Sequence, residues 1–112
     1  MSQITTHVLD TAKGKPAEGI KIMLCQQQGN DWLPIAQGFT NKDGRIEDLL
    51  PEKQTLPAGI YKMDFFTKDY FLRLAMSGFY PVVPIVFEIA SDEHYHIPLL
   101  LNPFGYTTYR GS

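Results

Sequence analysis

Several short stretches of this chain alternate apolar and polar side chains, and residues typical of turns separate them. Ile20, Ile22 and Leu24, for example, occupy every second position of the stretch 20–25. A period of two places alternate side chains on opposite faces of an extended strand, so one face of each strand can be buried. On this pattern we predict strands at 4–9, 20–25, 32–40, 60–66, 82–89, 94–101 and 106–110, and a shorter one at 46–50.

Only one stretch has the spacing of a helix. Residues 68–77 place Phe71, Leu74 and Ala75 on one helical face, Thr67 or Asp69 stands near the expected cap, and Gly78 is the expected stop. We therefore predict a single short helix between two strands.

Turn residues and prolines refine this pattern. Asp43-Gly44 readily supplies the positive φ angles of a tight hairpin turn, so we predict a hairpin there. Pro34 and Pro84 lie inside predicted strands. Because proline has no N–H to donate to a neighbouring strand, both positions indicate a sheet edge or a bulge.

Together these elements predict an all-β fold. Seven or eight short strands with one brief helix are typical of an antiparallel β-sandwich. The chain has 112 residues, which is close to the commonest domain size, and no repeat, low-complexity tract or linker divides it. We therefore predict a single domain over residues 1–112.

Composition excludes several kinds of partner. A net charge of −2 leaves no basic footprint, which argues against nucleic acid as the main partner. No stretch is apolar for long enough to span a membrane, and the first residues lack the features of a signal peptide. The single Cys25 cannot form an internal disulfide, so nothing requires an oxidising compartment. We expect a cytoplasmic protein that binds neither nucleic acid nor membrane.

The three histidines are candidates for chemistry. His94 and His96 are two residues apart, so on a strand they share one face. Such a pair could ligate zinc, but a zinc site needs a further ligand, and His7 is the only other histidine. A positioned histidine is also the usual general base near neutral pH. From spacing alone, a solvated or hydrogen-bonded structural role is the more frequent one for each of them.

Arg45 and the chain's last residues are weaker candidates. Arg45 follows the Asp43-Gly44 turn, and its planar five-donor group would suit a flat ligand carrying carbonyl or anionic oxygens. The last four residues, 109–112 (YRGS), would ordinarily fray. The concentration of polar and aromatic side chains there suggests instead that the end of the chain belongs to a site.

Four stretches resemble a known family. Residues 7–10 (HVLD), 40–45 (TNKDGR), 94–101 (HYHIPLLL) and 109–112 (YRGS) are similar to those of 5-hydroxyisourate hydrolases, which form a transthyretin-like family. The resemblance covers essentially the whole chain. It implies a transthyretin-like sandwich of about eight strands, assembled as a homotetramer (a dimer of dimers) with active sites in the channel between the dimers.

The resemblance also implies an activity and a set of residues. The activity is hydrolysis of 5-hydroxyisourate in urate catabolism, with no cofactor and no metal. The implied catalytic residues are His7, Arg45, His96 and Ser112. The implied substrate-binding residues are His7, Arg45, Tyr109, Arg110, Gly111 and Ser112. His94 remains a structural residue in this interpretation.

Two positions depart from the family pattern, and other functions stay open. Asn102 and Thr107 stand where family members commonly have serine, and we do not expect either change to abolish activity. The alternatives are a transthyretin-like carrier of a small hydrophobic ligand, a metal-binding protein using His7 and His96, and a purely structural sandwich. The sequence does not decide which histidine would be the base.

Overall fold

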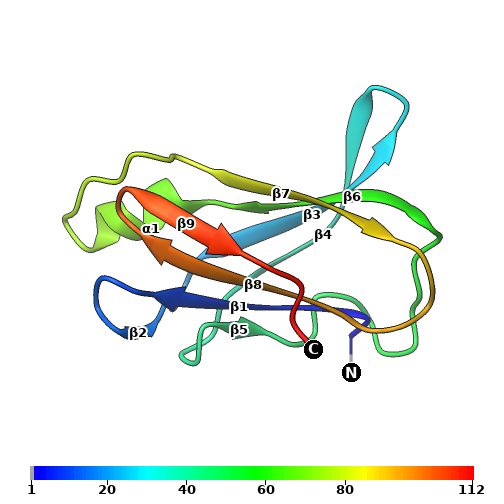
Figure 1. Ribbon diagram of the computed structural model, residues 1–112, viewed down its shortest axis with the longest axis horizontal. Helices are drawn as coiled ribbons and strands as arrows, with labels where there is room; N and C mark the ends of the chain where they lie inside the picture. Colours follow the sequence, from blue (N-terminus) through cyan, green and yellow to red (C-terminus); the bar gives the residue numbers. More distant parts are fainter. Residues whose placement is uncertain (1) are drawn as a thin grey trace.

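The computed structural model describes residues 2–112 and shows two β-sheets packed face to face (Figure 1). The first sheet contains β1 (Ile4–Asp10), β2 (Lys15–Pro16), β5 (Arg45–Ile46), β8 (Tyr95–Asn102) and β9 (Gly105–Thr108). The second sheet runs in the order β4-β3-β6-β7, from β3 (Lys21–Gln28), β4 (Asp31–Phe39), β6 (Gly59–Phe65) and β7 (Val83–Ile89). One short helix, α1 (Thr67–Arg73), lies between β6 and β7 in the chain. The predicted all-β sandwich with one helix is confirmed.

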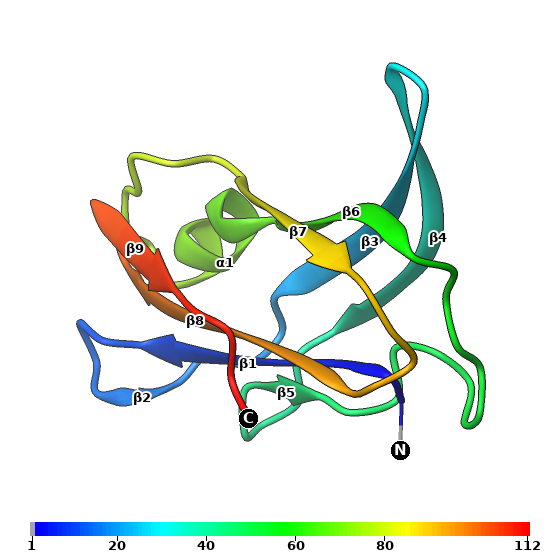
Figure 2. The ribbon, with the colours of Figure 1, turned by 45° about the vertical axis from the view of Figure 1, so that its right-hand side comes forward.

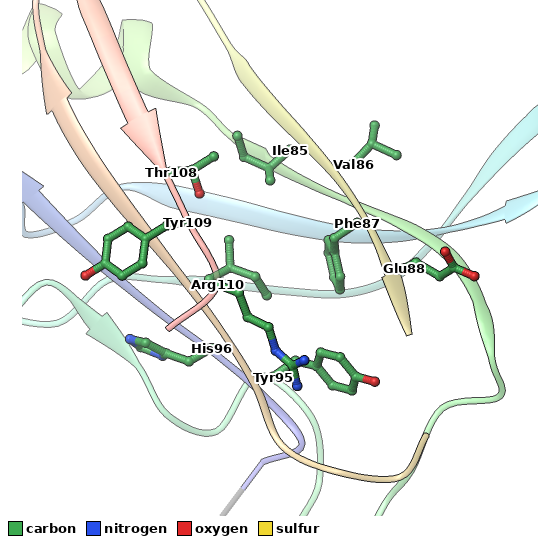
Figure 3. Close-up of a pocket in the computed structure, with 10 residues that line it drawn as sticks. Ile85, Val86, Phe87, Glu88, Tyr95, His96, Thr108, Tyr109 and Arg110 are labelled. Carbon is green, nitrogen blue, oxygen red and sulfur yellow. The ribbon is translucent and has the colours of Figure 1, made fainter. Parts of the chain in front are cut away.

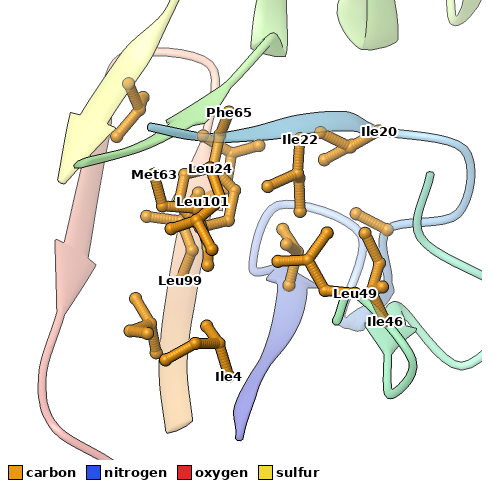
Figure 4. Packing of buried hydrophobic residues seen from close by; sticks show 14 of the residues in the cluster. Ile4, Ile20, Ile22, Leu24, Ile46, Leu49, Met63, Phe65, Leu99 and Leu101 are labelled. Atoms are coloured by element: carbon orange, nitrogen blue, oxygen red, sulfur yellow. The ribbon is translucent and has the colours of Figure 1, made fainter. Parts of the chain in front are cut away.

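Alternating side chains from both sheets form the core (Figure 4). Ile22 and Leu24 of β3 and Leu99 and Leu101 of β8 are almost completely buried, as the period of two predicts. Each such side chain contributes about 1.5–3 kcal/mol on burial. Cys25, the single cysteine, is also buried and free. Among residues 2–112, no helix has the length and apolar character needed to cross a membrane.

One strand pair departs from the antiparallel pattern. β1 and β8 run parallel, with Thr5 opposite His96 and His7 opposite Pro98. The remaining strand pairs are antiparallel. The parallel pair brings the first strand of the chain beside one of the last, so residues about 90 positions apart become neighbours.

The turn at Asp43-Gly44 forms, but the predicted hairpin is wrong. β5 pairs with β1 in the first sheet, whereas β4 belongs to the second sheet, so the turn carries the chain from one layer to the other. Of the predicted strand at 46–50, only Ile46 lies in β5, and the other residue of β5 is Arg45. β2 was not predicted, because its two residues lie within a turn-rich stretch.

The helix is shorter than predicted. It ends at Arg73, and Ala75 adopts a positive φ of 56° instead of lying on the apolar face. Tyr70 and Phe71 are the large side chains that the helix buries. Gly78 is therefore not the residue that stops the helix.

Both proline predictions are confirmed. Pro34 lies in β4 and Pro84 in β7, and these two strands form the edges of the second sheet. The register between β3 and β4 also shifts beside Pro34, which is the mark of a bulge.

Candidate active site

The outer face of the first sheet carries the histidines. In β1, Ile4 and Val8 point into the core and are fully buried, so the alternation turns Thr5 and His7 to the opposite face. His96 lies opposite Thr5 in the parallel register, and its neighbours Tyr95 and Ile97 are buried. The pairing of β1 with β8 thus brings His7 and His96 to one surface.

β5 adds Arg45 to this surface. Arg45 lies opposite His7 in the antiparallel pairing of β5 with β1. The preceding turn is fixed, because the N–H of Val8 donates to the carbonyl oxygen of Gly44 at 2.8 Å and the N–H of Arg45 donates to the Asn41 side chain at 3.0 Å. Gly44 has a φ of +74°, which glycine adopts without strain. The motif at 40–45 therefore holds Arg45 beside His7.

The end of the chain returns to the same face. After β9, the N–H of Gly111 donates to the carbonyl oxygen of His96 at 2.9 Å. A Cβ atom at Gly111 would lie 2.5 Å from Cδ2 of His96, so no larger residue fits without displacement. In both ribbon views the C-terminus lies beside β5 (Figures 1 and 2). The structure thus brings the end of the chain to the histidine surface.

These elements enclose a hollow of about 200 Å³, which we call the histidine hollow. Its lining comprises Thr5, Thr6, Arg45, Glu47, His94, His96 and Ser112. Three of the four residues expected to be catalytic, Arg45, His96 and Ser112, therefore meet in one place. The fourth, His7, lies next to the hollow through its pairing with Arg45.

The local electrostatics favour neutral imidazoles. Burial, followed by the positive charge of Arg45, lowers the pKa of His7 below its ordinary value, and Asp43 acts in the opposite sense. The pKa of His96 is also lowered, first by burial and next by Arg45. These shifts favour the neutral form of both rings, in which a nitrogen lone pair is available to accept a proton.

A threonine that the sequence analysis missed joins two of the histidines. The hydroxyl of Thr5 lies 2.7 Å from Nδ1 of His96 and 2.8 Å from Nε2 of His94. The rings of His94 and His96 are nearly parallel, with centroids 6.3 Å apart, so they share one face as predicted. Period-two alternation already places Thr5 on the face of His7, but only the pairing with β8 shows its contact with His96.

Tyr109 and Arg110 occupy a different place. They line a second hollow, of about 330 Å³, between β9 and β7, which Figure 3 shows. The Arg110 guanidinium lies 4.5 Å from the ring centre of Tyr95 and donates to the Glu93 carboxylate at 2.9 Å. Within one chain, these two predicted substrate-binding residues are thus separate from the lining of the histidine hollow, although His96 borders both hollows.

The histidines do not complete a metal-binding cluster in this chain. Within residues 2–112, no group of three or more His, Cys, Asp or Glu side chains is arranged to hold a metal ion. Thr5, which cannot replace a third nitrogen, sulfur or carboxylate ligand, stands between His94 and His96.

Comparison with known proteins places this geometry in a family. The chain is 45% identical over 118 residues to the 5-hydroxyisourate hydrolase of Mus musculus, covering 99% of this chain and 96% of the mouse protein. It is 44% identical over 110 residues to the Salmonella typhi 5-hydroxyisourate hydrolase, covering 97% of this chain and 80% of that protein.

Solved structures agree. Sea bream transthyretin in complex with thyroxine matches with a TM-score of 0.91 and 34% identity, covering 98% of this chain and 95% of that one. Klebsiella pneumoniae 5-hydroxyisourate hydrolase matches with a TM-score of 0.86 and 35% identity, covering 97% and 98%. The family model matches residues 4–111. This chain belongs to the HIUase/Transthyretin family.

Proposed function

We propose that this protein hydrolyses 5-hydroxyisourate, opening its six-membered ring to give 2-oxo-4-hydroxy-4-carboxy-5-ureidoimidazoline. The observation that carries the proposal is the meeting of His96, Arg45 and Ser112 in one hollow with His7 beside it. Relatives more than 40% identical over nearly the whole chain are 5-hydroxyisourate hydrolases. Family membership alone does not decide the activity, because transthyretin shares the fold.

The chemistry we propose is direct attack by water on the C6 carbonyl of the ring amide. His7 or His96 takes one proton from the water as the new C–O bond forms. His96 would use Nε2, because its Nδ1 is engaged by Thr5. The C–N bond of the ring then breaks, and the leaving nitrogen receives the proton that the histidine took from the water. No electron donor or acceptor is needed for this step.

Arg45 and Ser112 would have separate roles in the reaction. Arg45 would hold the flat ring through directed hydrogen bonds and stabilise the negative charge that develops on the carbonyl oxygen. Ser112 lines the same hollow as Arg45 and would position the water or the second histidine. Gly111 would allow the chain end to approach His96 closely, because it has no side chain to meet the imidazole and its N–H donates to the His96 carbonyl oxygen. No cofactor takes part.

The assembly that we propose is a homotetramer, a dimer of dimers. Support comes from β7 and β9, which are edge strands of the two sheets and border one hollow. Two neighbouring free edges offer unpaired backbone groups to a second copy. Tyr109 and Arg110 lie at this edge and would form channel walls between subunits. Light scattering should give four times the 12.7 kDa mass of one chain.

A carrier function is the second candidate, since sea bream transthyretin, solved with thyroxine, has nearly the same fold. The polar character of the histidine hollow, with Arg45, Glu47 and two histidines, argues against a small hydrophobic ligand there. We also propose a cytoplasmic location, which is compatible with the single, free Cys25.

The test is a coupled ultraviolet assay. Urate oxidase generates 5-hydroxyisourate from urate, and the decay of the product is followed with and without the purified protein. Faster decay that survives exhaustive chelation supports the proposed hydrolysis. Decay at the spontaneous rate by a folded tetramer would overturn it, and loss of activity on chelation would contradict the metal-independent step.

A further inference from the structure

We propose that Thr5 is a positioning residue that sets which ring nitrogen of His96 carries the proton. His94 accepts a hydrogen bond from Thr5 and so completes a hydrogen-bonded series that runs from His96 through Thr5 to His94. The inference rests on the proposed function, because it assigns a purpose to the free nitrogen of His96. It gives functions to two residues that the sequence analysis treated as structural or did not single out.

The geometry leaves the Thr5 hydroxyl little freedom. Thr5 is only 6% exposed, and its backbone is held in β1 directly opposite His96 of β8. Its Oγ1 lies 2.7 Å from Nδ1 of His96 and 2.8 Å from Nε2 of His94, both within the range of strong hydrogen bonds. The hydroxyl therefore bridges two imidazoles at once.

Proton counting then couples the two rings. A hydroxyl has one proton to donate and lone pairs that accept. To satisfy both contacts between neutral rings, Thr5 must donate to one histidine and accept from the other. If it accepts from Nδ1–H of His96 and donates to Nε2 of His94, then Nε2 of His96 has a free lone pair. In the reverse arrangement Nε2 of His96 carries a proton and cannot act as a base.

The first arrangement also suits the reaction. When Nε2 of His96 takes a proton from water, the ring becomes an imidazolium whose Nδ1–H still donates to Thr5. That hydrogen bond strengthens as the ring becomes charged, because the donor is then ionised. No proton needs to move through Thr5, and the Thr5 O–H continues to donate to His94. Thr5 and His94 thus orient the base without adding a negative charge to the site.

Other ionisable groups surround these three residues. His94 lines two hollows, and their other ionisable lining residues are Arg45, Glu47, His96, Lys53 and Asp92. His7 lies opposite Arg45 in the strand pairing. Arg45, His94 and His7 all act to lower the pKa of His96. Because the hydrogen-bonded series ends in an imidazole nitrogen and not in a carboxylate, it does not oppose the effect of Arg45.

The first test reads the tautomer directly. Nitrogen-15 NMR of histidine-labelled protein distinguishes the two ring nitrogens, and three histidines can be assigned with single variants. At pH 7 we expect His96 to carry its proton on Nδ1. In Thr5→Val the signal should shift toward the Nε2–H form, and Thr5→Ser should restore the wild-type spectrum. A wild-type His96 protonated on Nε2 would overturn the inference without bearing on whether the protein is a hydrolase.

The second test is kinetic. Thr5→Val should lower kcat about 10–100-fold, the range typical when hydrogen-bond partners of metal-binding histidines are removed, with KM near the wild-type value. In the profile of kcat against pH, the acidic limb of Thr5→Val should move to lower pH, because the His96 imidazolium loses the Thr5 oxygen as a hydrogen-bond acceptor. His94→Phe should change kcat in the same direction, and Thr5→Ser should restore activity. Wild-type kinetics in Thr5→Val would contradict the inference.

A matched control separates positioning from packing. Thr67 is also buried, and its hydroxyl donates to the Tyr80 carbonyl oxygen at 2.6 Å at the start of α1, outside the lining of both hollows. Thr67→Val should reduce stability but leave the His96 tautomer and the pH profile unchanged. A fall in kcat in Thr5→Val with an unchanged tautomer would mean that Thr5 acts through packing, which overturns the inference. An inactive wild-type protein would instead count against the proposed function.

Discussion

The backbone N–H of Gly111 donates to the carbonyl oxygen of His96 at 2.9 Å, which ties the end of the chain to the strand that carries a proposed base. The hydroxyl of Thr108 donates to the carbonyl oxygen of Pro98 at 2.7 Å and fixes the preceding strand to the same neighbour. The last residues are therefore ordered by contacts with β8. This order places Ser112 in the histidine hollow.

The contact predicts that alanine at position 111 disrupts the site. In Gly111→Ala the new Cβ would lie 2.5 Å from Cδ2 of His96 and 3.2 Å from Pro98, so the tail or the ring must move. We expect a large loss of kcat in the decay assay, with little change in the unfolding temperature. Gly105→Ala is the control, because its Cβ would meet only the Asn102 side chain at an ordinary 3.8 Å. Equal activity of both variants would contradict the proposed role of the tail.

The pH dependence follows from the direction of the histidine shifts. Burial and Arg45 lower the pKa of both His7 and His96 from the ordinary histidine value of 6.5. The neutral base therefore persists at pH values below 6.5. Activity should be level near pH 7 and fall only as the pH drops below about 6.5. An acidic limb centred above that value would contradict this account.

Removal of Arg45 should move that limb. Arg45→Gln takes away a charge that lowers the pKa of His7 and His96, so their pKa values rise and residual activity should be lost at higher pH than in the wild type. The measurement is kcat/KM against pH, with each variant normalised to its own maximum. Arg73→Gln is the control, because the Arg73 guanidinium lies over Tyr70 and donates to the Gly19 carbonyl. Its profile should match the wild type.

A buried pair elsewhere predicts an effect on stability alone. The hydroxyl of Tyr70 donates to Oδ2 of Asp10 at 2.7 Å, and Asp10 is only 1% exposed. Tyr70→Phe leaves that carboxylate oxygen without its partner, so the free energy of unfolding should fall by about 1–3 kcal/mol. Urea unfolding measures the change, and kcat should remain near the wild-type value. Tyr106→Phe, at a partly exposed tyrosine, should cost much less.

Local patterns were sufficient to predict most of the strands. Alternation at 20–25 and 60–66 corresponds to β3 and β6, whose inward residues are buried, and the prolines at 34 and 84 marked the sheet edges. Such features depend on neighbours in the sequence, which a single chain displays. The predicted C-terminal end of the helix was wrong, because Ala75, a good helix former, takes a positive φ where the chain turns away.

The long-range pairings could not be read in the same way. Nothing near residue 5 indicates that β1 runs parallel to β8, and nothing in Asp43-Gly44 indicates that the turn links two sheets. The resemblance to a family implied His7, Arg45, His96 and Ser112 as a group. It did not imply Thr5, whose hydroxyl became notable only when strand pairing placed it between two imidazoles.

The most direct test of the account is kcat for 5-hydroxyisourate in His96→Asn and His7→Asn beside the wild type, with folding checked by circular dichroism. Loss of general-base assistance is typically worth ~10²–10⁴ in rate, so at least the variant that removes the base should lose that much. We expect both to be impaired, because Arg45 lowers the pKa of both histidines and therefore acts on both rings. Near-wild-type kcat in both folded variants would contradict the claim that the histidine surface is the active site.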